Sequence, residues 1–285
     1  MCILKLDNVS KSFSNFSLND ISLELPKGYI IGYIGPNGSG KTTTIKLITN
    51  QYLPDSGTIY INGKKLSEAE AKYKNSIGYI ADDFYFPDHF KINTIKKVLK
   101  DFYPTFNSLS FDNYINLWQL PMNQNVGTFS KGMKIRLMFA CVLSRKPELL
   151  ILDEATNGLD PIVRKEILLI LKEYIKDGEH SVLFSTHILS ELDNIADYIY
   201  MIINGKCALT GTKDEILDDF VLISGSIEHQ EFFQKKCVGS TQNGNYLEGL
   251  MRSDNIDFLP SKLSFKKPTL DQILLFHSKE ATQNG

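Results

Sequence analysis

The sequence has no long apolar run. No stretch of its 285 residues approaches the ~20 apolar residues that span a bilayer. Its start, MCILKLDNVS, has no basic region followed by a long apolar segment, so neither a signal peptide nor a lipid anchor is indicated. The net charge of -2 gives no reason to expect nucleic acid or a membrane surface bound by bulk charge. Association with a membrane would therefore need a specific docking surface.

Paired cysteines and internal repeats are also missing. The four cysteines are scattered without a CxxC pair, which argues against a zinc site and fits a reducing cytosol. What is present is the composition of an ordinary globular protein, with 42% hydrophobic and 22% charged residues. The chain is long enough for one large domain, with or without a small second one.

The first 80 or so residues alternate short apolar runs with turn residues. The runs that read as strands are ILKLDNV, DISLEL, YIIGYIG, TIYING and SIGYIA. The segment KTTTIKLITN follows a strand directly and has helical spacing. This strand, loop and helix unit predicts an α/β fold with a parallel sheet.

Three regions follow from the change of pattern along the chain. From about residue 87 to 147 the spacing is helical and rich in aromatic residues, which predicts a helical subdomain with the rings in its core. The runs LLILDE and HSVLFSTH then resume the α/β layer, so the helical block is an insertion. We predict one domain over 1–218 and a small C-terminal extension over 219–285 that ends in a disordered ATQNG.

The strongest motif is GPNGSGKT, which matches the phosphate-loop pattern GxxxxGK[ST] between an apolar run and a helical segment. Its glycines let successive backbone N–H groups surround a polyphosphate, while the lysine reaches the outer phosphates and the Thr42 hydroxyl ligates Mg²⁺. The predicted nucleotide-binding residues of this loop are Gly35, Pro36, Asn37, Gly38, Ser39, Gly40, Lys41, Thr42 and Thr43.

Two further strand ends carry candidate catalytic residues. In LLILDE, a buried strand ends in two acids, of which Asp153 would hold Mg²⁺ and Glu154 would polarise the attacking water. In FSTH, His187 also follows an apolar strand, where it can donate a hydrogen bond to a γ-phosphate. With the phosphate loop, these residues predict an ATPase in which Lys41, Glu154 and His187 are catalytic.

The motifs GPNGSGKTT, FSKGM, LLILDE with ATNGLD, and STH, in that order, resemble the ATP-binding subunit of an ABC (ATP-binding cassette) transporter. The resemblance covers about residues 1–218. It implies a P-loop NTPase parallel-sheet core with an N-terminal antiparallel β subdomain and an inserted α-helical subdomain. It also implies ATP and Mg²⁺ as cofactors.

The same resemblance assigns roles that spacing alone does not. FSKGM stands where the family has its signature, usually LSGGQ, so Ser130 and Gly132 would contact ATP held by a second cassette. NGLD matches the D-loop, which would place Asp160 at the dimer interface. Phe13 matches the aromatic residue that stacks on adenine, although a core position in a strand hairpin explains it as well.

Two positions depart from the family pattern. Asp82 stands where the family usually has glutamine, and its shorter, charged side chain would still reach Mg²⁺ or the attacking water. Lys131 stands where LSGGQ has glycine, at a helix N-terminus that disfavours a cation. Lys131 would either attract the ATP of a neighbouring cassette or extend into solvent.

The resemblance implies a motor subunit at the cytoplasmic face of the cell membrane. ATP would close a homodimer or heterodimer of cassettes, and hydrolysis would open it, which drives a separate permease docked around residues 79–90. FSKGM with KIR, and DPIVRKEI, resemble the bacterial exporters of drugs, antibiotics and peptides. No nucleic-acid partner is expected.

Other classes explain less of the sequence. A soluble ABC ATPase that acts on ribosomes or nucleic acid usually has two cassettes or a long coiled coil, and this chain has one cassette and no such heptad run. A small-molecule kinase or GTPase leaves FSKGM, NGLD and STH unexplained. A regulator that only binds ATP is disfavoured because Glu154 and His187 are both present.

Overall fold

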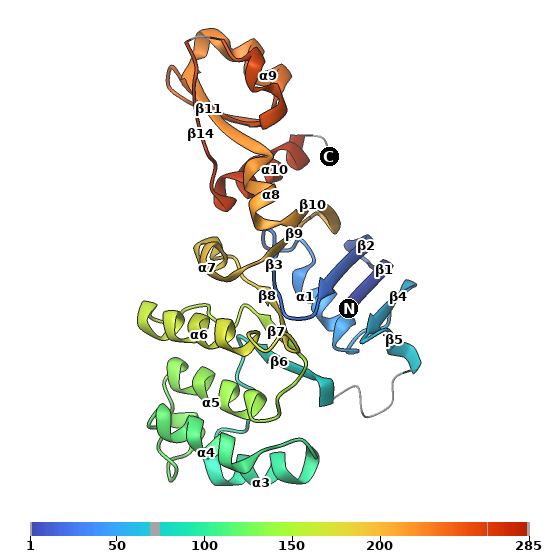
Figure 1. Cartoon of the computed structure of the whole chain (residues 1–285), viewed down its shortest axis with the longest axis vertical. Coiled ribbons are helices and arrows are strands. Elements are labelled where there is room, and N and C mark those ends of the chain that lie inside the picture. Colours follow the sequence, from blue (N-terminus) through green and yellow to red (C-terminus); the bar gives the residue numbers. More distant parts are fainter. Residues whose placement is uncertain (1, 69–74, 261, 284–285) are drawn as a thin grey trace.

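Three sheets organise the computed structural model, which describes residues 2–68, 75–260 and 262–283 (Figure 1). The first is antiparallel, in the order β2-β1-β4-β5. Its strands are β1 (Cys2–Phe13), β2 (Phe16–Pro26), β4 (Ser56–Ile61) and β5 (Lys64–Lys65). In β2 the buried Ile21, Leu23 and Leu25 alternate with exposed residues, which is the pattern of a sheet with one buried face.

The second sheet has the order β10-β9-β3-β8-β7-β6, and its strands are parallel except for β10. The strands are β3 (Ile30–Ile34), β6 (Ile77–Ala81), β7 (Leu149–Asp153), β8 (Ser181–Ser185), β9 (Tyr198–Ile203) and β10 (Lys206–Thr212). Every residue of β3, β7 and β8 is buried, as the continuous apolar runs predict for a sheet covered on both faces. The predicted α/β core is confirmed.

Helices cover both faces of the parallel sheet. Their bounds are α1 (Lys41–Ile48), α3 (Ile92–Phe102), α4 (Ser108–Leu117), α5 (Lys131–Leu143), α6 (Pro161–Tyr174), α7 (Leu189–Ile195) and α8 (Lys213–Asp218), with short 3₁₀ turns η1 (Leu66–Glu68) and η2 (Val126–Thr128). In β7, Leu149 and Ile151 pack into one core with α1 and the antiparallel sheet. Leu150 and Leu152 pack into the other, with the remaining helices.

Helices α3, α4 and α5 form the helical block between β6 and β7, at the bottom of Figure 1. Phe111 and Trp118 are buried in its core, as predicted. The prediction is wrong for Phe102, whose side chain is 75% exposed at the C-terminal end of α3. Glu166 of α6 ties the block to the core by accepting hydrogen bonds from Trp118 and Arg136.

Residues 220–260 and 262–283 form a unit with a third sheet, in the order β12-β13-β11-β14. Its elements are β11 (Phe220–Ser226), η3 (Ile227–His229), α9 (Gln230–Lys236), β12 (Cys237–Asn243), β13 (Tyr246–Arg252), η4 (Ser253–Phe258), β14 (Ser264–Lys266) and α10 (Leu270–Gln283). The predicted boundary at residue 218 coincides with the end of α8 and stays a prediction. The expected disorder of ATQNG is wrong for Ala281–Gln283, which continue α10, while residues 284–285 lie outside the described residues.

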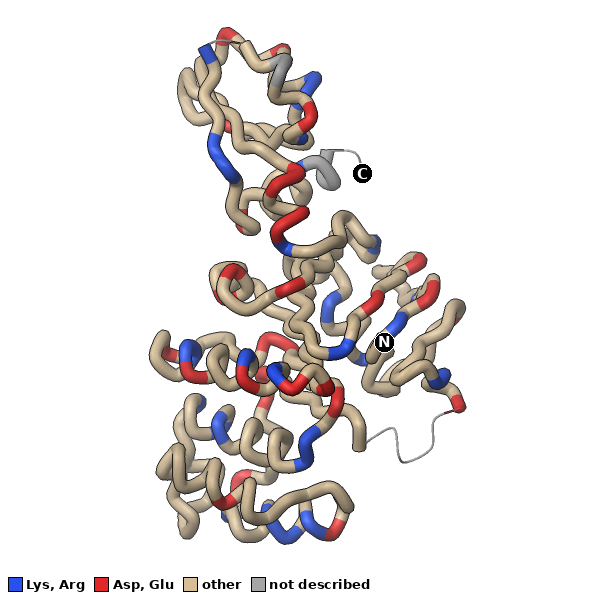
Figure 2. Tube along the Cα trace, viewed as in Figure 1, with Lys and Arg blue, Asp and Glu red and all other residues tan. Residues whose placement is uncertain are grey.

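The distribution of charge and the length of the helices indicate which kinds of partner the surface suits. Figure 2 shows positive and negative residues mixed over all parts of the drawn chain, without one large region of a single sign. Within the described ranges, no helix combines the length and the apolar character that crossing a membrane requires.

The turn between β9 and β10 holds the phosphate loop in place. Asn204 and Gly205 form a two-residue hairpin turn, in which both φ angles are positive. The Gly205 N–H donates to the Ser39 carbonyl at 3.0 Å, and the Gly205 carbonyl accepts from the Asn19 N–H at 2.8 Å. The turn therefore connects the phosphate loop to the β1–β2 hairpin.

We expect Gly205→Ala to destabilise the protein strongly, because a Cβ there would lie 1.9 Å from the Ser17 carbonyl oxygen at φ +73°. Gly63→Ala is the matched control: Gly63 has the same φ in another Asn-Gly hairpin, but its Cβ would meet nothing within 4 Å. The control should cost about 1 kcal/mol, and Gly205→Ala about 2 kcal/mol more. Equal midpoints in urea unfolding of the two variants would contradict this expectation.

Candidate active site

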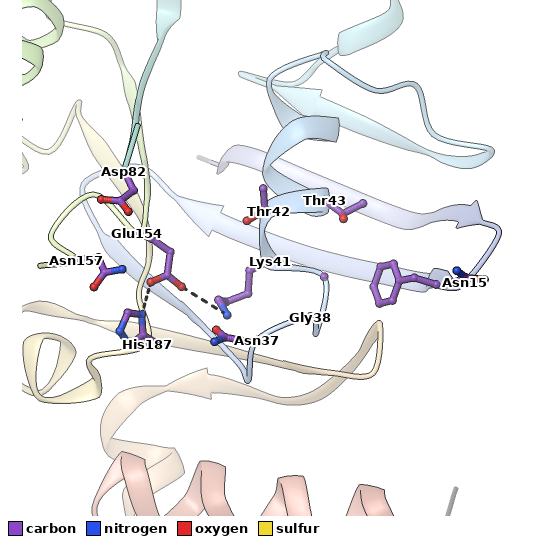
Figure 3. Close-up of a pocket in the computed structure, with 12 residues that line it drawn as sticks. Asn15, Asn37, Gly38, Lys41, Thr42, Thr43, Asp82, Glu154, Asn157 and His187 are labelled. Carbon is purple, nitrogen blue, oxygen red and sulfur yellow. Dashed lines mark hydrogen bonds and ion pairs between the residues drawn. The ribbon is translucent and has the colours of Figure 1, made fainter. Parts of the chain in front are cut away.

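The parallel register brings three loops to one edge of the sheet. Ser185 at the end of β8 pairs with Tyr33 of β3 on one side and with Asp153 of β7 on the other. The residues that follow these strands are the phosphate loop, Glu154 and His187. Their side chains meet at the carboxyl ends of the strands, where open α/β sheets bind ligands (Figure 3).

The phosphate loop connects β3 to α1 and is fixed by close packing. A Cβ on Gly35 would lie 2.2 Å from the Ile202 carbonyl oxygen, so a larger residue does not fit. Gly40 caps α1 with φ +113°, a conformation that L residues rarely adopt. The loop therefore leads into the N-terminus of α1, whose unpaired N–H groups favour an anion.

Lys41 is buried next to this loop, with only 5% of the residue exposed. Its Nζ donates to the carbonyls of Gly35 at 2.8 Å and Pro36 at 3.2 Å, and lies 3.7 Å from Glu154 Oε1. Burial lowers the pKa of Lys41, while the charges of Glu154 and Asp153 oppose that shift. The buried cation is thus held among oxygen atoms that an incoming phosphate can replace.

Thr42 and Asp153 form a pair suited to a hard cation. The Thr42 hydroxyl donates to Asp153 Oδ1 at 3.4 Å. Burial raises the pKa of the Asp153 carboxyl, and the Thr42 hydrogen bond acts in the opposite direction. Among the described residues there is no cluster of three His, Cys, Asp or Glu that would hold a metal alone. One hydroxyl, one carboxylate and substrate phosphates are nonetheless a set that fits Mg²⁺.

Glu154 lies at the centre of the site. Its Oε2 bonds His187 Nδ1 and its Oε1 faces Lys41, as the dashed lines in Figure 3 mark. Its backbone has φ +55°, an unusual value for glutamate, and its N–H donates to the Ser185 carbonyl at 2.9 Å. This turn directs the carboxylate into the cavity immediately after the buried strand.

These loops are also held by a buried carboxylate, Glu191. The sequence alone did not identify it. Glu191 of α7 is 2% exposed and accepts hydrogen bonds at 2.9 Å from the hydroxyls of Thr156 and Thr186. Its other oxygen lies 3.0 Å from Arg164 Nε, and Arg164 also donates to the Leu159 carbonyl. Burial raises the pKa of Glu191, and these partners oppose the shift. Glu191 thereby joins the residues after Glu154, the D-loop and the residue before His187.

The side chains enclose a cavity of about 710 Å³. The predicted residues that line it are Asn37, Gly38, Gly40, Lys41, Thr42, Thr43, Asp82, Glu154 and His187. Asn15 and Phe16, which the sequence did not single out, also line it, as does Asn157, the first residue of NGLD. Phe16 packs over Gly40, a contact between segments distant in sequence. Phe13 is not among the lining residues; its ring is 40% exposed and 5.6 Å from that of Tyr52.

The predicted signature residues Ser130 and Gly132 and the D-loop residue Asp160 lie outside the lining of this cavity. Ser130 caps α5 by accepting from the Met133 N–H at 3.2 Å, and Gly132 follows in its first turn. Asp160 caps α6 by accepting from the N–H groups of Ile162 and Val163. The structure therefore does not bring these three residues to the phosphate loop of their own chain.

The two departures from the family pattern meet in space. Asp82 follows β6 and Lys131 begins α5, and Lys131 Nζ lies 2.5 Å from Asp82 Oδ1. Neither sequence alternative for Lys131, a neighbour's ATP or solvent, included this partner.

These features define the protein as a P-loop ATPase. They are the parallel sheet, the phosphate loop at a helix N-terminus, and the adjacent Asp153, Glu154 and His187. The model of the ABC transporter family matches residues 18–157. The chain belongs to that family, as an ATP-binding subunit, and such subunits dimerise and work with transmembrane permeases.

Individual relatives agree with this assignment. The chain is 34% identical over 226 residues to the lantibiotic transport ATP-binding protein SrtF of Streptococcus pyogenes, covering 74% of this chain and 92% of the relative. It is 32% identical to the sulfate/thiosulfate import ATP-binding protein CysA of Synechocystis sp., covering 75% and 61%. A solved ATP-binding subunit of an ABC transporter superposes with a TM-score of 0.69 at 28% identity, covering 75% and 91%.

We expect Asp153→Asn to make the nucleotide-free protein more stable near neutral pH. Because the pKa of Asp153 is raised above 3.8 by burial, its carboxyl contributes fully to stability below that value and loses the contribution as pH rises through the raised pKa. The gain of the variant in urea unfolding should therefore grow as the pH rises from 3.8 through the raised pKa of Asp153. The same variant should weaken Mg²⁺-dependent ATP binding about tenfold or more.

Asp177→Asn is the control of opposite sign. Hydrogen bonds, chiefly from the Glu179 N–H, lower the pKa of Asp177, so its contribution to stability is present above 3.8 and is lost as pH falls through the lowered pKa. This variant should lose stability at neutral pH and keep ATP binding. Equal pH profiles of wild type and Asp153→Asn would contradict the assignment of a buried charge at Asp153.

Proposed function

We propose that the chain binds ATP with Mg²⁺ in this cavity and hydrolyses it at the interface of two cassettes arranged head to tail, which drives a separate permease. The observation that carries the proposal is the position of Glu154 between Lys41 and His187, at the rim of a cavity that begins at the phosphate loop.

Each of these residues has a role that its surroundings favour. The loop N–H groups and Lys41 hold the phosphates, and Thr42 and Asp153 would hold Mg²⁺, which would neutralise phosphate charge. Glu154 orients the attacking water and accepts its proton, because its carboxylate projects into the cavity beside Lys41. His187 contacts the other oxygen of Glu154, and from there it donates a hydrogen bond to the γ-phosphate. Catalysis is then mainly positioning and charge stabilisation.

The proposed dimer gives a role to residues that do not line the chain's own cavity. Ser130, Gly132 and the N-terminus of α5 lie outside the chain's own cavity, so the ATP that they contact is held by a second cassette. Asp160 is assigned to the same interface. Phe13 remains the proposed adenine contact because its ring is exposed, and Phe16 is a second candidate because it lines the cavity.

The permease would dock beside the helical block, at the cytoplasmic face of the membrane. An apolar groove of about 590 Å³ lies there, lined in part by Tyr85, Phe86 and the exposed Phe102. Tyr85 and Phe86 belong to the predicted docking segment 79–90. Arg145 also lines the groove, and its guanidinium lies 3.7 Å from the centre of the Tyr103 ring. A cytoplasmic helix with apolar side chains fits this surface.

An exported drug, antibiotic or peptide is the favoured cargo. The name of SrtF mentions lantibiotic transport and that of CysA mentions sulfate and thiosulfate import, so similarity to relatives supports more than one direction. The resemblance of FSKGM and DPIVRKEI to exporter sequences supports export.

Glu154→Gln tests the catalytic assignment. The variant should bind ATP with unchanged affinity and lose turnover by a factor of about 10² to 10⁴, because the amide does not accept the proton of the water. In gel filtration with ATP, it should accumulate as a dimer. Measured steady-state ATPase activity at the original rate would show that another residue is the base.

Glu148→Gln is the matched control for this change. Glu148 precedes the same strand, β7, at its opposite end, where it pairs with Lys27 at 3.4 Å. Its loss should leave turnover within about twofold, since Glu148 does not line the cavity.

Phe102→Ser tests the docking surface. We expect the isolated chain to keep its ATPase rate, because Phe102 is 75% exposed and lies outside the ATP cavity. Co-purification with a co-expressed membrane-spanning permease chain should fall about tenfold. Leu117→Ser is the control, as an equally apolar residue that is 66% exposed on α4 and is not among the groove's lining residues. Equal co-purification of both variants with that membrane chain would rule out this groove.

A further inference from the structure

The ion pair between Asp82 and Lys131 lies at the rim of the ATP cavity. Asp82 lines the cavity together with Lys41 and Glu154. Its side chain is 37% exposed and that of Lys131 is 48% exposed, with 2.5 Å between Oδ1 and Nζ. The pair therefore joins the end of β6 to the first residue of the signature helix α5.

Lys131 also lies against the D-loop of its own chain. A Cβ built on Gly158 would be 3.4 Å from Lys131 Nζ, and this glycine has φ +66°. The neighbouring Asn157 lines the same cavity as Asp82. The ammonium group is thus positioned between the end of β6 and residues 157–160.

A carboxylate at the position of Asp82 is unfavourable for a site that binds a triphosphate. Like charges that share a cavity repel each other, and the repulsion strengthens when the ligand displaces water. Asp82 is the second carboxylate that lines this cavity, with Glu154, and the buried Asp153 lies next to Glu154 in the chain. Of these, Glu154 faces Lys41 and Asp153 accepts from Thr42, whereas Asp82 is paired with Lys131.

We propose that Lys131 is a positioning residue for the ATP site of its own chain: it neutralises Asp82 and holds that carboxylate at the rim, so that the triphosphate enters without repulsion. The inference rests on the proposed binding of ATP in this cavity. The role of the signature toward a second cassette then belongs to Ser130 and Gly132. Asp82 in turn offsets the unfavourable position of a cation at the N-terminus of α5.

Four variants in a Glu154→Gln background test the proposal, because ATP binding is then measured without turnover. The probe is ATP with Mg²⁺, in equilibrium dialysis against the full chain at low and high sodium chloride. Lys131→Met should weaken ATP binding about tenfold at low salt and less at high salt. Adding Asp82→Asn to Lys131→Met should restore affinity to within about twofold.

Lys134→Met is the matched control. It removes the same charge from the first turns of α5, but Lys134 lies 4.0 Å from Asp88 and over the Phe84 ring, and it does not line the cavity. Its effect on ATP affinity should stay within about twofold.

Asp82→Asn alone should bind ATP at least as well as the parent. The unfolding midpoint of Lys131→Met without ATP should equal that of the parent, since its pair is half exposed.

The rescue decides between the roles of Lys131. If Lys131 acted directly on the ATP of a second cassette, the double variant would bind ATP as weakly as Lys131→Met, and the proposal would be overturned. Unchanged affinity in Lys131→Met would overturn it as well. Failure of the proposed ATP site is seen separately, since Lys41→Ala would then leave ATP binding intact in the same assay.

Discussion

The parallel pairing of β8 with both β3 and β7 is the constraint on which the site depends. Ser185 is level with Tyr33 and with Asp153, so the loops after the three strands begin at the same edge. The strands are buried on both faces, and a shift of one residue would exchange their two apolar faces. The two hydrophobic cores therefore fix the register, and the register fixes where Lys41, Glu154 and His187 meet.

At and near this edge the protein buries several charged groups, each beside partners that satisfy it. The buried ammonium of Lys41 is satisfied by loop carbonyls and Glu154, and burial raises the pKa of Asp153. Glu191 beneath the loops has the same need and meets it with two hydroxyls and Arg164. Removal of Arg164 would leave the buried Glu191 charge without its cation, at a cost of several kcal/mol. Such a site suits the ligand that we propose, ATP with Mg²⁺.

Much of this site was predictable from the sequence. The phosphate loop, the acids after LLILD and the histidine after SVLFS are local patterns, and a buried parallel strand is itself an apolar run. The helical block was predictable from its spacing. The unit after residue 219 was less so, because β12 has no fully buried residue and its sequence, CVGSTQN, gives no alternating pattern.

The sequence by itself determined the class of protein, the loop that binds phosphate and the order of the elements, because these depend on neighbouring residues and their periodicity. Only the tertiary structure decided that Lys131 pairs with Asp82, that Glu191 joins three loops, and that Phe102 faces solvent. Side chains far apart in sequence meet through the packing of whole helices and strands. The periodicity of apolar residues in a sequence indicates which face of one helix or strand is buried. It does not identify the side chain of another element that packs against that face.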